Sequence, residues 1–142
     1  MTISAILQNK GREVTQVRSS DRVLSVVQLL SEKRIGCVPV VDDGEVVGMF
    51  SERDLVRHVA RDGSAVLDRT VAEVMTTPPI TTDDKTPIIH CLSLMTKKRV
   101  RHLPVVVDGA LAGLVSIGDL VKFRIDTIES EAAALRDYIQ SA

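Results

Sequence analysis

Two stretches of the chain place an apolar residue at every third or fourth position, which is the spacing of a helix that buries one face. The first stripe comprises Val23, Val26, Val27 and Leu30, and the second comprises Ile88, Cys91, Leu92 and Met95. Asp21 stands just before the first stripe and predicts its N-cap. Thr86 does the same for the second stripe, and Pro87 follows it as a residue favoured at the first helical position.

Each predicted helix is followed by two apolar runs with an Asp-Gly pair between them. The pair is Asp43-Gly44 in the first half of the chain and Asp108-Gly109 in the second. Asp-Gly supplies the positive φ angles that a tight hairpin turn requires. Each half is therefore expected to contain two antiparallel strands.

The same order of elements occurs twice because the sequence itself is repeated. Residues 39–51 recur at 104–116, at an offset of 65 without a gap. Apolar segments at 14–17 and 80–82 predict a short strand ahead of each first helix, a second helix is expected after each hairpin, and residues 61–73 predict a linker. Each unit is thus β-α-β-β-α, an α/β (α+β) arrangement. At on the order of 60 residues, neither unit buries enough surface to be stable alone.

Along the chain we expect three segments: repeat 1 with an N-terminal helix at 1–66, repeat 2 at 67–124, and a C-terminal amphipathic helix at 125–142. An apolar stripe with near-heptad spacing runs into the last segment and comprises Val121, Ile125, Ile128, Ala132, Leu135 and Ile139. Such a stripe must be covered. Either the helix folds back on its own domain, or the equivalent helix of a second subunit covers it.

Composition and charge exclude several classes of function. Lys and Arg total 18 against 19 Asp and Glu, which gives a net charge of −1, and aromatic residues make up only 2% of the chain. This argues against a general polyanion binder and leaves no stacking platform for single-stranded nucleic acid. No apolar run approaches the roughly 18 residues that span a bilayer. Residues 1–11 are too polar for a signal peptide, so a cytoplasmic location is expected, with Cys37 and Cys91 as free, buried thiols.

The sequence contains no grouping of residues typical of a catalytic or metal site, so an enzyme is not expected. What recurs instead is Gly-x-x-Ser-x-x-Asp, with Ser51 and Asp54 in the first unit and Ser116 and Asp119 in the second. Ser followed three residues later by an acid resembles a capping box. A helix N-terminus also suits phosphate, and a carboxylate there can accept hydrogen bonds from ribose hydroxyls. Both interpretations can hold at once.

A basic run is the second candidate feature. Residues 97–99 are explained by their place at a helix C-terminus, where cations are favoured. Arg101 and His102, however, begin a strand bound for the core, and the matching residues of the first unit are Gly36 and Cys37. This asymmetry favours phosphate binding. A nucleic-acid patch is the weaker alternative, since the chain is slightly acidic.

Together these motifs resemble the tandem cystathionine-β-synthase (CBS) domains that form Bateman modules. The resemblance covers residues from about 14 to 122, and it is carried by the segments 38–42 and 48–54 and their copies at 103–107 and 113–119. One such motif is unspecific, but two in register are a strong signal. The resemblance implies repeats packed about a pseudo-twofold axis with two clefts for adenosine-containing ligands. These are AMP, ADP, ATP or NAD(H), with S-adenosylmethionine ranked lower.

By the same similarity, each cleft takes its ribose-binding Asp from one repeat and its base-facing wall from the other. The first cleft is expected to comprise Ser51, Arg53, Asp54, Ile80, Thr82, Val100, Arg101, His102 and Pro104. The second is expected to comprise Thr15, Val17, Ile35, Gly36, Cys37, Pro39, Ser116, Gly118 and Asp119. Because the basic residues gather in the first cleft, phosphorylated ligands are expected to prefer it.

The function expected is that of a regulatory module that senses adenosine nucleotides and has no catalytic cofactor and no metal. The partners expected are an adenosine-containing small molecule, a second copy of the chain in a homodimer, and an unidentified regulated protein. No membrane is expected, and nucleic acid is the weaker alternative. The alternative is a structural dimerisation module whose clefts are vestigial.

Overall fold

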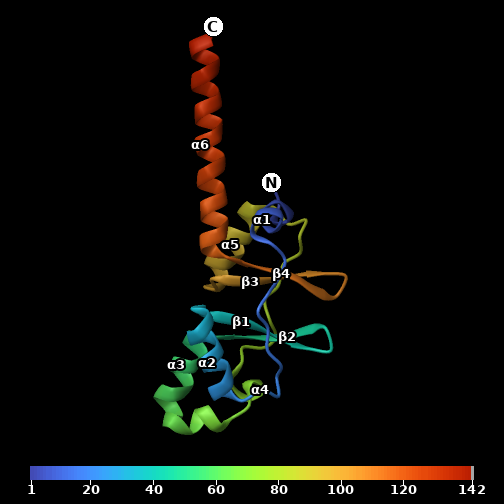
Figure 1. Cartoon of the computed structure of the whole chain (residues 1–142), viewed down its shortest axis with the longest axis vertical. Helices are drawn as coiled ribbons and strands as arrows, with labels where there is room; N and C mark the ends of the chain where they lie inside the picture. Colours follow the sequence, from blue (N-terminus) through green and yellow to red (C-terminus); the bar gives the residue numbers. More distant parts are fainter. Residues whose placement is uncertain (142) are drawn as a thin grey trace.

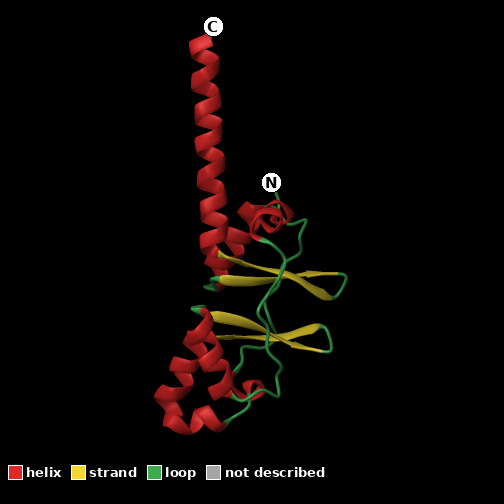
Figure 2. Cartoon of the chain, in the orientation of Figure 1, coloured by secondary structure: helices red, strands yellow, loops and turns green. Residues whose placement is uncertain are grey.

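The computed structural model describes residues 1–141, with one β-hairpin and its covering helices in each half (Figure 1). In chain order the elements are α1 (Ile3–Lys10), α2 (Val23–Lys33), β1 (Cys37–Asp42), β2 (Glu45–Ser51), α3 (Glu52–Asp62), the 3-10 helix η1 (Gly63–Asp68), α4 (Val71–Val74), α5 (Ile88–Lys98), β3 (His102–Val107), β4 (Ala110–Ser116) and α6 (Ile117–Ser141). The two hairpins lie side by side in the middle of the molecule, and the helices lie at its two ends (Figure 2). The predicted α/β repeat architecture with a C-terminal helix is confirmed.

The two hairpins have the same register, as the sequence repeat predicts. Val38 faces Phe50 in the first, and Leu103 faces Val115 in the second. Both Asp-Gly turns have positive φ angles, 50° and 81° in the first hairpin and 51° and 78° in the second. Strands β2 and β4 contact each other, so the two units meet through their hairpins.

Both helical stripes are confirmed, but both predicted caps are wrong by one residue. The apolar faces of α2 and α5 are buried. Arg22, not Asp21, is the N-cap of α2, because the Asp21 carboxylate accepts a hydrogen bond of 2.9 Å from the Arg18 amide. Pro87 is the N-cap of α5, not its first helical residue, and the Thr86 hydroxyl donates to a nearby carboxylate. In both cases the polar side chain closes a turn ahead of the helix.

Two further expectations are corrected. The strands expected at 14–17 and 80–82 are reduced to single bridges, in which Val17 pairs with Val40 and Thr82 pairs with Val105, both parallel. The expected linker at 61–73 is also structured, because α3 continues to Asp62 and η1 and α4 follow. Short segments of this kind gain order from packing rather than from their own propensity.

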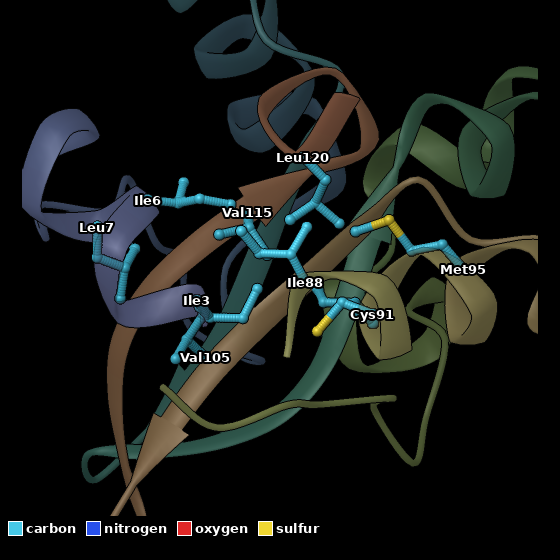
Figure 3. Packing of buried hydrophobic residues seen from close by; sticks show 10 residues of the cluster. Ile3, Ile6, Leu7, Ile88, Cys91, Met95, Val105, Val115 and Leu120 are labelled. Carbon is cyan, nitrogen blue, oxygen red and sulfur yellow. The ribbon is translucent and has the colours of Figure 1, made fainter. Parts of the chain in front are cut away.

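The core consists of two clusters, and each includes a helix from outside its own repeat. Ile3, Ile6 and Leu7 of α1 are buried in the cluster of the second unit (Figure 3). Val71 and Val74 of α4 are buried in the cluster of the first unit. The segment boundaries at 66/67 and 124/125 stay a prediction, but packing cuts across them.

Each exchanged helix packs against a glycine of the opposite hairpin. A Cβ on Gly48 would lie 2.6 Å from the Met75 sulfur and 2.9 Å from the Thr76 carbonyl oxygen. A Cβ on Gly113 would lie 2.7 Å from a methyl carbon of Leu7. The glycines of the repeated motif are therefore the points where backbone and helix approach closely.

Helix α6 runs unbroken from the second hairpin to the end of the described chain. Its base contacts α1, α5 and β4, and Leu120 is fully buried there. Beyond the base, every residue from 128 to 141 is exposed, and the helix extends away from the body of the molecule (Figure 1). Within residues 1–141, no helix combines the length and the apolar character needed to cross a membrane.

Candidate functional site

A cavity of about 690 Å³ lies between the two units, where the start of α3 faces the segment that leads into β3. Its volume falls within the range of small-molecule sites. From the first unit it takes the end of β2 and the first turns of α3, and from the second unit it takes the end of α5 and the start of β3. The site is therefore built only when both repeats are folded together.

The Asp54 carboxylate is the central polar group of this cavity. Asp54 is only 6% exposed and is the buried charged residue of the described chain. One of its oxygens accepts hydrogen bonds from the Ser51 amide at 2.9 Å and from the Ser51 hydroxyl at 3.0 Å. The other accepts from the Thr76 hydroxyl at 2.8 Å. The predicted capping box of α3 is thus present, and it holds the carboxylate in one orientation.

The neighbouring thiol responds to the same burial and charge. Burial, together with the negative charge of Asp54, raises the pKa of Cys37 to about 12. Cys37 and Cys91 are both free and buried, as predicted. The Cys37 thiol is therefore protonated at neutral pH and is part of the wall rather than a nucleophile.

Five cationic side chains line the same cavity: Arg53, Arg57, Lys98, Arg99 and Arg101. None of them forms an ion pair with a carboxylate in the part of the chain that the structure describes. The Arg53 guanidinium donates a hydrogen bond of 3.4 Å to the Arg99 carbonyl, which joins the two units across the cavity. These five cations outnumber the two carboxylates of the cavity, Glu52 and Asp54, and such an excess of positive charge suits an anion that carries several negative charges.

His102 lies beside this cationic group and is half-buried. Burial lowers its pKa below the ordinary value, and the positive charges of Lys10 and Arg101 lower it further, although Asp119 acts in the opposite direction. The imidazole is therefore neutral at pH 7. It can offer one ring N–H as a donor.

Apolar side chains form the remaining walls of the cavity. They are Met49, Pro79, Ile80 and Val100. No Phe, Tyr or Trp lines the cavity within the described residues. An adenine ring here would lie between aliphatic surfaces.

The second repeated carboxylate has a different environment. The Lys10 ammonium donates to Asp119 at 2.6 Å and to the Leu114 carbonyl at 2.9 Å. The Ser116 amide also donates to Asp119, at 2.9 Å. Burial alone would raise the pKa of Asp119, but the hydrogen bonds from Lys10 and Ser116 and the Lys10 charge lower it overall. At Asp54 the Thr76 hydroxyl donates to the oxygen that Ser51 leaves free, whereas at Asp119 the Lys10 ammonium donates to the same oxygen as the Ser116 amide.

The structure brings most of the expected first cleft together. Ser51, Arg53, Asp54, Ile80, Val100, Arg101 and His102 line the cavity. Thr82 and Pro104 do not line it, because their backbones pair with each other through a 3.0 Å hydrogen bond from the Thr82 amide to the Pro104 carbonyl. Sequence reasoning did not name Thr76 or the basic residues Arg57, Lys98 and Arg99 as parts of this site.

The residues expected in the second cleft are not gathered in either of the two cavities described here. Gly36 and Cys37 line the cavity of Asp54 instead. Thr15 lies in a separate groove of about 700 Å³ between the 12–16 segment and the two hairpin turns. Val17 is buried in the core of the first unit, and Ile35 packs against that core. Pro39 is buried in β1, while Ser116, Gly118 and Asp119 lie at the start of α6.

A buried carboxylate and a cationic rim between two hairpin repeats define a class of small-molecule-binding repeat module. Comparison with known proteins agrees with this class. The family model of the CBS domain matches residues 10–61 and again residues 71–126. The chain therefore belongs to the CBS domain family and contains two copies of the domain.

Relatives with the same pair of domains occur in distant organisms. A mitochondrial CBS domain-containing protein of Arabidopsis thaliana is 31% identical over 98% of this chain and 72% of its own length. The crystal structure of a CBS-domain-containing protein from Agrobacterium tumefaciens matches 87% of this chain and 99% of its own, with a TM-score of 0.84 and 38% identity. A CBS domain protein from Pyrobaculum aerophilum, solved in complex with AMP, matches 84% of this chain and 89% of its own, with a TM-score of 0.74 and 27% identity.

Proposed function

We propose that this chain is a regulatory module that binds an adenosine nucleotide in the cavity of Asp54. The observation that carries the proposal is the meeting of one buried carboxylate and five cationic side chains without ion pairs in a cavity shared by both repeats. The relative from Pyrobaculum aerophilum that was solved with AMP supports an adenosine-containing ligand. No catalytic grouping is part of the proposal.

The two ends of the ligand would be recognised by different chemistry. Only the Thr76 hydroxyl donates to the second oxygen of Asp54, which leaves a lone pair for a ribose hydroxyl. The phosphate would lie among the arginine and lysine side chains, since guanidinium groups form paired hydrogen bonds with phosphate oxygens. The adenine would lie between Ile80 and Val100. A ligand placed in this way touches both repeats, which is what a module that transmits occupancy to a partner protein requires.

The test uses a matched pair of isosteric variants. Asp54→Asn keeps the shape of the side chain but removes the charge that ribose hydroxyls would prefer, and Asp119→Asn makes the same change in the second unit. We expect Asp54→Asn to weaken AMP and ATP binding in isothermal titration by about tenfold to a hundredfold. We expect Asp119→Asn to change it by less than about threefold. Equal losses in the two variants would refute the preference for the first cleft.

A thermal-shift screen with AMP, ADP, ATP, NADH and S-adenosylmethionine identifies the ligand. A shift with the adenylates supports the proposed function, and the order of their affinities reports how many phosphates the cationic rim accommodates. NAD(H) is the next candidate, because a second phosphate is also present in it. No shift with any of the five would favour the alternative, a structural module whose purpose is dimerisation.

We also propose that the chain is a homodimer.

A further inference from the structure

The exposed half of α6 presents an apolar face that the chain itself does not cover. Ile128 is 49% exposed, Leu135 is 59% exposed and Ile139 is 64% exposed. No residue from 128 to 141 has another part of the described chain to pack on (Figure 1). A helix that stands free in water is marginal, because most helical stability in proteins comes from packing of an apolar face. Of the two alternatives that the sequence leaves open, folding back on the same domain is therefore wrong.

The apolar stripe points away from the body of the molecule. Leu120 is buried at the base of α6, and Phe123 packs against the same cluster, so these two residues mark the side that faces the body. At 3.6 residues per turn, the stripe of Val121, Ile125 and Ile128 lies about a third of a turn from that side. A second helix can therefore reach the stripe without displacing any element of the chain.

The stripe has the heptad spacing of a coiled coil. In heptad notation, Ile125, Ala132 and Ile139 take the a positions, and Val121, Ile128 and Leu135 take the d positions. Towards the free end, Leu135 at d and Ile139 at a match the combination of leucine at d with isoleucine at a that favours two parallel strands. The occupant that fits such a stripe is another helix with the same spacing.

The charged residues beside the stripe select a second copy of this same helix. Arg124 and Glu131 lie on one flank at the g positions, and Glu129 and Arg136 lie on the other at the e positions. In a parallel pair in register, each g residue faces the e residue five positions later in the other helix. Arg124 then faces Glu129 of the second copy, and Glu131 faces Arg136, so the two symmetric halves form four pairs of opposite charge.

The antiparallel arrangement with full overlap has the opposite electrostatics. When Ile125 faces Leu135 of the other helix, the flanking positions bring Glu129 against Glu129 and Glu131 against Glu131. Like charges that face each other disfavour one pairing and so specify the other. We infer that residues 121–139 of α6 form a parallel, in-register coiled coil with a second copy of the chain. This inference rests on the proposed homodimer and is independent of nucleotide binding.

A cysteine placed near the free end of the helix tests the orientation. In the parallel pair Ile139 faces Ile139, whereas in the antiparallel pair the two are about 27 Å apart at 1.5 Å per residue. Ile139→Cys is therefore expected to form a disulfide-linked dimer under mild oxidation on a non-reducing gel. Asp137→Cys, two residues away on the opposite face, is the matched control and is expected to stay unlinked. The native Cys37 and Cys91 are buried and do not compete.

Sizing over a range of concentrations tests the stripe and its charges in the full-length protein. Leu135→Glu is expected to raise the dissociation constant of the dimer by about a hundredfold or more, because it places two carboxylates in the seam. Ala133→Glu, which adds the same charge outside the seam, is expected to leave the constant within a few-fold of that of the native protein.

Arg124→Glu is expected to weaken the dimer, because the new carboxylate would face Glu129 of the second copy. Addition of Glu129→Arg to the same chain is expected to restore the dimer. A dimer that Leu135→Glu does not weaken, or equal linking of both cysteine variants, would overturn the inference. The nucleotide-induced thermal shift is also measured on Leu135→Glu. Because the cavity lies in the body of the molecule, this measurement distinguishes failure of the coiled-coil inference from failure of the proposed nucleotide binding.

Discussion

Replacement of Lys10 by methionine is expected to make the Asp119 carboxylate more available to a ligand. In the structure the Lys10 ammonium holds the Asp119 carboxylate through a 2.6 Å contact and also donates to the Leu114 carbonyl. A ribose that pairs its two hydroxyls with both oxygens of Asp119 must displace this ammonium from the oxygen that also accepts from Ser116. Methionine keeps most of the length and apolar surface of the side chain but cannot hold the carboxylate. The substitution therefore tests whether a cation within the chain occupies the site that the repeat duplicates.

The size of the effect follows from the exposure of the pair. The Lys10 side chain is 39% exposed and that of Asp119 is 28% exposed, so the contact is screened by water. A partly exposed ion pair contributes at most about 1 kcal/mol. Its removal should lower the free energy of unfolding by no more than that amount, because Ile3, Ile6 and Leu7 still anchor α1. In the variant a ligand at Asp119 no longer has to break this ion pair, so the dissociation constant of the ligand is expected to fall by about fivefold, which corresponds to the same 1 kcal/mol.

The assay isolates binding at Asp119 and uses a ligand without phosphate. Adenosine is titrated by NMR into Asp54→Asn and into Asp54→Asn/Lys10→Met. Adenosine is chosen because Lys10, once displaced, could itself contact a phosphate and hide the gain. Lys85→Met in the same background is the control, since Lys85 is exposed and forms none of the described ion pairs. Binding that stays equal or weakens in the Lys10 variant would refute the reasoning.

Two further predictions concern stability. Gly48→Ala is expected to lower the free energy of unfolding by about 1–3 kcal/mol, because the new Cβ would meet the backbone oxygen of Thr76. Gly113→Ala is expected to lower it by less, because the new Cβ would meet only the flexible end of the Leu7 side chain. Urea denaturation of both variants measures the two losses, and a larger loss in Gly113→Ala would contradict the argument. Because the pKa of His102 is lowered in the folded protein, the unfolded chain binds a proton there more readily than the folded chain does. The protein should therefore lose stability as the pH falls from about 6.5, the ordinary pKa of histidine, towards the lower pKa of the folded state. His102→Gln should lose less over this window in denaturation curves at pH 7.5 and 5.5, and equal losses would count against a buried, neutral imidazole.

The sequence predicts those parts of the fold that local chemistry determines. The Asp-Gly turns have their positive φ angles because only a few residues tolerate that conformation, and the two helical stripes are buried because their spacing matches the helix. The errors at Asp21 and Thr86 are of one residue, because a side chain that closes a turn is as favourable there as a cap. Such competition between two local hydrogen bonds has no signature in the sequence.

The exchange of α1 and α4 between the units could not be predicted from local patterns alone. It is a long-range contact, and neither helix shows in its own residues which cluster it joins. One signal was nevertheless present, since Ile3, Ile6 and Leu7 have the same spacing as Val71, Val74 and Met75. Recognition of this shorter repeat would have made α1 the counterpart of α4 and assigned both to the opposite hairpin.

The site was predicted as far as the repeated motif extends, and the missing residues come from the exchanged helices. Thr76 follows α4 and Lys10 ends α1, so each residue reaches its carboxylate only through the exchange. The resemblance to CBS domains named residues of the hairpins, of the helix starts and of the segments ahead of the first helices, but not these two. Because Thr76 is a neutral hydroxyl and Lys10 is a cation, Asp54 and Asp119 have unequal electrostatic environments.

Because of this difference, the two carboxylates would respond differently to a ligand. At Asp54 the hydroxyl of Thr76 can remain in place while the second lone pair is used, so binding requires no rearrangement of α4. At Asp119 a ligand that uses both carboxylate oxygens must release Lys10, which is the last residue of α1. Helix α1 contacts the base of α6 as well as β4. A ligand at Asp119 would therefore loosen a helix that lies against the base of the proposed coiled coil, whereas a ligand at Asp54 would tighten the contact between the two units.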